Sequence, residues 1–90
     1  MPISEALANR RRRLELSQEA IAKRAGLTQT YLSKIERAKV DPRLSTIQDV
    51  ARAVGSEIVL VPTESLPALR AVLGQGRSPE DRPLFEVERE

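Results

Sequence analysis

The sequence predicts an all-α bundle of short helices followed by one short C-terminal strand. Two observations predict the helices. Apolar residues recur at helical spacing through residues 3–55, and capping residues and glycines divide this stretch into short segments. The third observation is a mostly β-branched run at residues 58–61, bounded by Gly55 and Pro62, which breaks the helical rhythm. With 90 residues the chain makes one domain with a thin core, for which marginal stability or oligomerisation is expected.

The composition excludes most catalytic chemistry. The sequence contains no Cys and no His, which removes disulfides, thiolate metal sites, cysteine nucleophiles and histidine acid–base catalysis. No enzyme activity, cofactor or metal is therefore expected. Residues 1–30 hold no apolar leader-like run, and no apolar stretch approaches the length of a membrane span. The expectation is a cytoplasmic protein with no membrane partner.

The charge is unevenly distributed between the two halves of the chain. The overall net charge is only +2. Residues 1–45 carry ten Lys and Arg against five Asp and Glu, a net charge of +5, whereas residues 46–90 carry five against eight, a net charge of −3. A basic half joined to an acidic half suits a nucleic-acid-binding face attached to a segment with another role.

Residues 3–15 are expected to form the first helix, with Ser4 as a candidate cap. Its apolar stripe consists of Ile3, Leu7 and Leu14. Arg11 falls on the same stripe. A guanidinium that faces a core requires a carboxylate partner, so Arg11 is expected to form an ion pair.

Residues 17–25 and 28–37 are expected to form the next two helices. Ser17 and Thr28 are suitable N-caps, and Gly26 supplies a left-handed residue between the helices. The inner faces carry Ile21, Ala22, Leu32 and Ile35, and the outer face of 28–37 carries Gln29, Thr30, Ser33, Lys34 and Arg37. Two short helices, a tight glycine turn and a polar outer face on the second helix indicate a helix-turn-helix. Amide, hydroxyl and cationic side chains are the types that bond base edges and phosphates.

Three further segments follow. A fourth helix is expected to open with the capping box of Ser45 and Gln48 and to end at Gly55. The strand at 58–61 and an amphipathic helix at 64–73 come next, and the remaining residues are rich in Gly, Pro, Ser and charge. The expected domains are a helix-turn-helix domain at 3–55, a dimerisation strand and C-terminal helix at 56–73, and a flexible tail at 74–90.

Residues 3–55 resemble the Cro and lambda-repressor class of helix-turn-helix proteins, the XRE family. The matching positions are Leu16-Ser17-Gln18, Ile21-Ala22, Gly26, Leu32-Ser33, Ile35-Glu36, Pro42 and the Ala-x-x-x-Gly that ends at Gly55. The resemblance implies a lambda-repressor-like fold and a sequence-specific DNA-binding regulator. It departs from the family pattern at Ala38, where the family has Gly. A left-handed turn costs Ala about 1–2 kcal/mol, so the third helix is expected to end differently.

The resemblance also implies roles for individual residues. An arginine of the first helix pairs with the glutamate that ends the recognition helix, which here implies a structural ion pair of Arg11 and Glu36. Base contacts are implied for Gln29, Thr30 and Lys34, and phosphate anchoring for Gln18. Ser33 and Arg37 are expected to position the helix on the DNA backbone. Two alternatives stay open: Lys34 and Arg37 are ordinary surface charges, and Tyr31 either braces a phosphate through its hydroxyl or simply packs.

The strand prediction leads to a dimer. A single strand cannot satisfy its own backbone groups, and the sequence offers no second one. Pairing of Ile58, Val59, Leu60 and Val61 with the same residues of a second chain would create an antiparallel β-ribbon on a two-fold axis. The alternative is that the segment packs against the fourth helix with no dimer role. A homodimer also suits double-stranded DNA with an inverted repeat, because one small module buries little surface.

A helix-turn-helix followed directly by such a strand is similar to the HipB-like antitoxins, in which the strand forms an intersubunit sheet. That resemblance implies an operon-encoded transcriptional repressor that is also the antitoxin of a HipA-like kinase toxin. The alternative is a free-standing phage-like or chromosomal regulator without a toxin partner. The tail carries Leu84, Phe85 and Val87 among acidic residues. This segment either docks to a partner or stays solvated.

Overall fold

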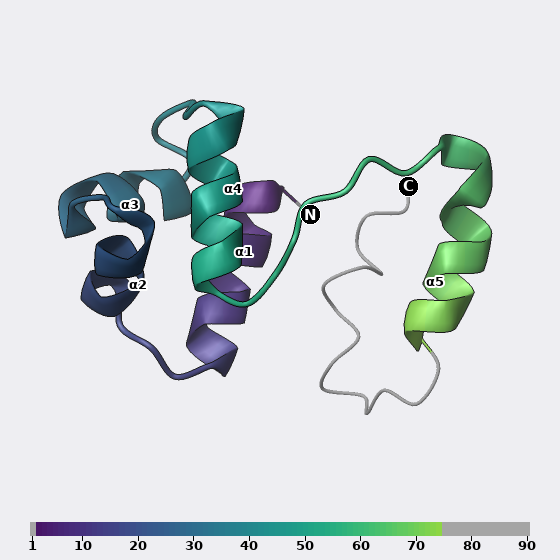
Figure 1. Ribbon diagram of the computed structural model, residues 1–90, viewed down its shortest axis with the longest axis horizontal. Helices are drawn as coiled ribbons and strands as arrows, with labels where there is room; N and C mark the ends of the chain where they lie inside the picture. Colours follow the sequence, from purple (N-terminus) through teal and green to yellow (C-terminus); the bar gives the residue numbers. More distant parts are fainter. Residues whose placement is uncertain (1, 75–90) are drawn as a thin grey trace. The chain divides into compact units, whose positions relative to one another are not determined.

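The computed structural model describes residues 2–74, which divide into two units, Pro2–Ile58 and 59–74. Four helices make up the first unit: α1 (Ile3–Arg13), α2 (Gln18–Ala25), α3 (Gln29–Glu36) and α4 (Leu44–Ala53). The second unit holds a 3-10 turn, η1 (Thr63–Ser65), which leads into α5 (Leu66–Gly74) (Figure 1). The described residues thus confirm the all-α prediction. None of their helices has the length and apolar character that crossing a bilayer requires.

Helices α2 and α3 begin at the predicted caps. The Ser17 hydroxyl accepts a hydrogen bond from the Ala20 amide at 3.0 Å, and the Thr28 hydroxyl accepts one from the Tyr31 amide at 3.1 Å. Each bond satisfies one of the free amides of a first helical turn. The local chemistry of a cap therefore fixes both starts.

The starts of α1 and α4 correct the predictions. Helix α1 is preceded by Pro2 in extended conformation, with no side-chain cap, so Ser4 lies inside the helix. Helix α4 begins at Leu44 after Arg43, again without a side-chain cap, so the box of Ser45 and Gln48 does not form. In both cases the helix begins ahead of the predicted cap, which leaves that residue with helical rather than extended backbone.

The four helices of the first unit all end in the same way. A residue with positive φ follows one or two positions after the last helical residue: Glu15 (φ 60), Gly26 (φ 75), Ala38 (φ 58) and Gly55 (φ 70). After α3 the Ala38 amide donates to the Ile35 carbonyl at 3.0 Å and the Lys39 amide to the Lys34 carbonyl at 2.9 Å, which is a Schellman motif. The expectation that α3 ends differently is therefore wrong: Ala38 adopts the left-handed conformation in place of Gly.

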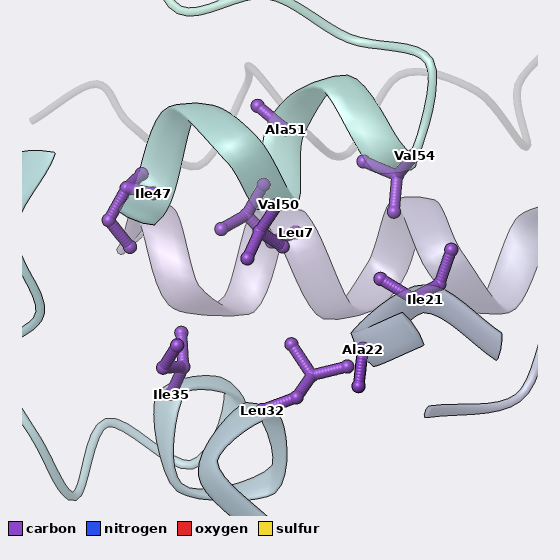
Figure 2. Close-up of a cluster of buried hydrophobic side chains, with 9 residues drawn as sticks. All are labelled: Leu7, Ile21, Ala22, Leu32, Ile35, Ile47, Val50, Ala51 and Val54. Carbon is purple, nitrogen blue, oxygen red and sulfur yellow. The ribbon is translucent and has the colours of Figure 1, made fainter. Parts of the chain in front are cut away.

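The core lies between α1, α2, α3 and α4 (Figure 2). It consists of Leu7, Ile21, Ala22, Leu32, Ile35, Ile47, Val50, Ala51 and Val54. Two members of the predicted α1 stripe lie outside it, since Ile3 is 49% and Leu14 39% exposed. Ile3 is the first residue of α1, and Leu14 follows its last residue. Leu7 alone of the stripe anchors α1 in the core.

Residues 56–62 have no regular secondary structure in the single chain described here. Ile58 packs against the core of the first unit, whereas Val59 and Leu60 are 70% and 99% exposed. A strand is defined by the neighbour with which it pairs, and the predicted neighbour is a second chain. In the second unit, α5 follows η1 close to the predicted bounds of 64–73, and none of its residues is buried.

Candidate nucleic-acid interface

The turn between α2 and α3 consists of Gly26, Leu27 and Thr28. The Leu27 amide donates to the Ala22 carbonyl at 2.8 Å, which closes the end of α2 around the left-handed Gly26. Leu27 packs against the core, and Thr28 starts α3 in extended conformation. Because both ends of the turn are fixed by hydrogen bonds, α2 and α3 are held in one arrangement, that of a helix-turn-helix.

Helix α3 has two opposed faces. Leu32 and Ile35 are fully buried, with 0% and 1% of their surface exposed. On the other side Gln29, Thr30 and Lys34 are exposed. The Thr30 hydroxyl and the Lys34 ammonium form no hydrogen bond or ion pair within the described part of the chain, so both groups are available to a ligand.

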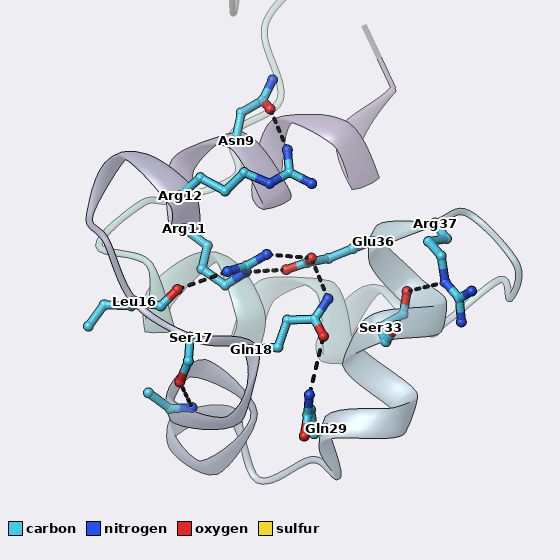
Figure 3. A network of polar contacts seen from close by, with 11 residues as sticks. Asn9, Arg11, Arg12, Leu16, Ser17, Gln18, Gln29, Ser33, Glu36 and Arg37 are labelled. Carbon is cyan, nitrogen blue, oxygen red and sulfur yellow. Dashed lines mark hydrogen bonds and ion pairs between the residues drawn. The ribbon is translucent and has the colours of Figure 1, made fainter.

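Behind this face lies a polar network centred on Glu36 (Figure 3). Arg11 donates to both carboxylate oxygens of Glu36, from Nε at 2.7 Å and from Nη2 at 3.0 Å, and its Nη1 donates to the Leu16 carbonyl at 2.8 Å. Gln18 Nε2 donates to Glu36 Oε1 at 2.9 Å. The carboxylate thereby ties α1, α2 and the C-terminal end of α3 together.

The Glu36 carboxylate and the Arg11 guanidinium both stay charged in this network. Burial opposes ionisation of Glu36, but the hydrogen bonds from Arg11 and Gln18 outweigh it, and the pKa of Glu36 lies below its ordinary value. The same hydrogen bond raises the pKa of Arg11. The side chains are only 12% and 5% exposed, so each ion depends on the other for its stability.

The network reaches the exposed face through Gln18. Its Oε1 lies 3.5 Å from Nε2 of Gln29, at the start of α3 (Figure 3). At the other end of α3, Arg37 Nε donates to the Ser33 carbonyl at 3.4 Å, which folds the guanidinium back along the helix. The structure therefore brings Gln18 beside Gln29, and Ser33 beside Arg37, along one edge of the exposed face.

The other predicted site residues fall in different places. Tyr31 is half-buried and packs against the core. This packing explains why an aromatic ring stands here, and phosphate contact by its hydroxyl stays a prediction. Of the predicted dimer strand, Ile58 is turned to the core and Leu60 is fully exposed. The partner-docking residues of the tail, Leu84, Phe85 and Val87, lie outside the described residues.

Two arginines bind the carbonyls at the end of α4, a role that the sequence does not predict. Arg10 Nε donates to the Val54 carbonyl at 3.0 Å, and Arg24 Nη1 donates to the Ala53 carbonyl at 3.3 Å. No role was predicted for either residue. The signal that would have identified them is the end of α4, whose last carbonyls need donors that α4 itself cannot provide.

The sequence of this chain matches the helix-turn-helix family over residues 7–61. The chain belongs to this family. The match runs from α1 through α4 and includes the linker after it, so it covers the whole arrangement that holds α3. The resemblance is thereby confirmed at the level of helix-turn-helix proteins.

Curated relatives agree with this assignment. The chain is 39% identical over 79 residues to the uncharacterized HTH-type transcriptional regulator y4dL of Sinorhizobium fredii, a match that covers 88% of this chain and 40% of the relative. It is 41% identical over 68 residues to antitoxin HigA1 of Mycobacterium tuberculosis, covering 76% of this chain and 44% of the relative. The immunity repressor protein of Bacillus phage phi105 is 34% identical over 58 residues, covering 64% and 40%. The chain thus spans less than half the length of each of these relatives.

Proposed function

We propose that this protein is a sequence-specific DNA-binding transcriptional repressor that binds an inverted-repeat operator as a homodimer. The observation that carries the proposal is the exposed face of α3, where Thr30 and Lys34 have free polar groups beside Gln29. These three side chains read bases in the major groove. An amide bonds adenine bidentately, an ammonium suits the acceptors of guanine, and a threonine offers both a hydroxyl and a methyl group.

The residues around this face position it on the DNA. Gln18, at the first turn of α2, anchors a phosphate, and its amide is held by Glu36 at 2.9 Å. Ser33 and Arg37 lie at the edge of α3 and contact the backbone. Phosphate contacts of this kind set register and orientation, while the base contacts select the sequence.

The homodimer forms through residues 58–61. Val59 and Leu60 are 70% and 99% exposed in the single chain, and adjacent exposed apolar residues with unpaired backbone groups favour pairing with another strand. Antiparallel pairing with a second copy covers these residues and relates two α3 helices by a two-fold axis, which matches an inverted repeat.

The finer proposal is that this repressor is an antitoxin. The relative named antitoxin HigA1, 41% identical, supports an antitoxin role in general. The choice of a HipA-like kinase as the toxin rests only on the resemblance of a helix-turn-helix followed directly by an apolar segment. The second candidate function is a free-standing regulator; the relatives named immunity repressor protein and transcriptional regulator y4dL support a regulatory role in general.

A gel-shift titration of the full chain against its own promoter tests the repressor proposal. A discrete complex that survives a large excess of unrelated DNA is expected; a complex that unrelated DNA competes away equally well contradicts it. Co-expression with the product of the adjacent gene then separates the two finer roles. Stable co-purification together with neutralised growth inhibition supports the antitoxin, and the absence of both leaves the free-standing regulator.

A further inference from the structure

Two arginines from different helices meet at the end of α4. The carbonyl of Ala53 accepts from Arg24 of α2, and the carbonyl of Val54 accepts from Arg10 of α1, at 3.3 and 3.0 Å. Arg10 Nη2 also lies 3.7 Å from where a Cβ on Gly55 would stand. The guanidinium of Arg10 therefore covers the turn at which the chain leaves α4.

The residues after this turn are held to the same unit. The Gly55 amide donates to the Arg52 carbonyl at 2.9 Å and the Ser56 amide to the Ala51 carbonyl at 2.8 Å, which completes a Schellman motif. Ile58 then packs against the core, and the next residue belongs to the second unit. The chain thus leaves the helix-turn-helix unit from a fixed point, which we call the exit joint, residues 54–58 together with Arg10 and Arg24.

We propose that Arg10 and Arg24 are positioning residues that determine which half-site spacing the dimer accepts. The inference rests on the proposed homodimer on an inverted repeat. The proposed dimer segment, residues 58–61, begins at the last residue of the joint, so the direction in which the joint releases the chain sets the separation of the two α3 helices. Arg24 belongs to α2 of the helix-turn-helix itself, so it connects this direction to the DNA-reading unit without an intervening flexible segment.

A fixed joint has a definite consequence for binding. When two modules are linked stiffly, the effective concentration of the second module is high at one separation of the DNA sites and low at others. A loose link gives similar effective concentrations at many separations. Capping of α4 alone would affect only the folding of the unit. Spacing selectivity is therefore the readout that separates a positioning role from a purely structural one.

The test is in vitro selection from fully random DNA duplexes with the full-length protein, followed by sequencing. The variants are Arg10→Met and Arg24→Met, and the matched control is Arg12→Met. Arg12 lies on α1 with Arg10, and Arg12→Met removes the same charge. Its one side-chain hydrogen bond among the described residues is to Asn9, at 3.0 Å, and it makes none to the end of α4. We expect wild type and Arg12→Met to recover inverted repeats with one dominant spacing.

Both joint variants should recover the same half-site sequence, with the share of the dominant spacing reduced by about half or more as neighbouring spacings enter. Unchanged half-sites with an unchanged narrow spacing overturn the inference while leaving the proposed function intact. If wild type recovers no paired half-sites, the proposed function and the inference both fall. Should Arg10→Met unfold in a thermal melt, Arg24→Met decides alone, because its hydrogen bond lies at the exposed edge of the joint.

Discussion

At the scale of single residues, the Glu36 carboxylate is the group on which most of the site depends. It joins Arg11 and Gln18, and through Gln18 it approaches Gln29 on the exposed face. Removing one partner of a buried ion pair leaves the other charge without compensation, which costs more than the pair itself contributes. Glu36 therefore has consequences for folding and for the orientation of the Gln18 and Gln29 amides, which are proposed to face DNA.

Glu36→Gln is expected to lower the free energy of unfolding at neutral pH by about 1.5–3 kcal/mol, the usual range for hydrogen bonds to a charged group. The pKa of Glu36 is lower in the folded than in the unfolded chain. Its contribution is therefore present above the unfolded pKa and is lost as the pH falls through the folded pKa. Urea unfolding of wild type and variant at neutral and acid pH measures this.

The difference in the free energy of unfolding between wild type and Glu36→Gln should become smaller as the pH is lowered. Glu19→Gln provides the control, since Glu19 is exposed and forms no ion pair among the described residues. An equal difference in the free energy of unfolding at both pH values would show that the charge of Glu36 does not stabilise the fold.

Ala38→Gly is expected to stabilise the protein. Ala38 has φ 58, a conformation that costs a residue with a Cβ about 1–2 kcal/mol and that Gly adopts freely. The midpoint of urea unfolding should rise. Ala6→Gly, inside α1, should lower the free energy of unfolding by about 1 kcal/mol, because Gly is a poor helix former. A loss of stability in Ala38→Gly would show that the left-handed turn is not strained.

Lys34→Ala should weaken binding to the operator by about 1–3 kcal/mol and relax its sequence preference, because a base-reading side chain discriminates between base pairs. Anisotropy titrations against the operator and its single-base variants measure both effects. Lys23→Ala, an exposed lysine of α2, controls for charge. A uniform loss over all operator variants would make Lys34 a phosphate contact instead.

At the scale of elements, sequence reasoning succeeded where local chemistry decides. A hydroxyl at Ser17 or Thr28 can satisfy an amide three residues on, and glycine at Gly26 permits a left-handed turn, whatever the rest of the chain does. The helix stripe that holds Arg11 likewise predicted that this cation needs a carboxylate.

The misses have a tertiary origin. Ser45 is a residue type that often caps a helix, yet α4 starts at Leu44. A suitable capping residue therefore does not by itself decide at which of two neighbouring positions a helix begins. The role of Arg10 depends on the end of α4 arriving beside it, 44 positions along the chain. A basic run in one helix carries no local sign of which arginine meets a carbonyl from such a distant segment.

The segment at 58–61 has its own prediction. Leu60→Glu should convert the proposed dimer to a monomer, because it places a charge where the proposed ribbon would bury an apolar side chain. The fold of the first unit should persist, since Leu60 is 99% exposed in the single chain. Sedimentation velocity measures the change, with Ile3→Glu as a control at a half-exposed apolar position of α1. If Leu60→Glu remains dimeric, the dimer forms elsewhere.

Across the whole molecule, the uneven charge is consistent with one part that binds DNA and another part that has a different role. Residues 1–45 carry a net charge of +5 and residues 46–90 a net charge of −3. The basic part contains α3 and the site residues, and the acidic part contains the proposed dimer segment. Because lysine and arginine contacts release counterions from DNA, the logarithm of the binding constant should fall linearly with the logarithm of salt concentration. Titrations over a range of salt concentrations check this, and a flat dependence would contradict phosphate contact.

The proposed dimer reads DNA with two copies of the exposed α3 face. A hydroxyl-radical footprint of the full-length protein on its own promoter shows whether binding is paired in this way. We expect two protected patches related by a dyad, on one face of the duplex and centred about one helical turn, 10–10.5 bp, or a multiple of it apart. Protection of a single patch, or weak protection spread evenly along the fragment, would contradict paired binding.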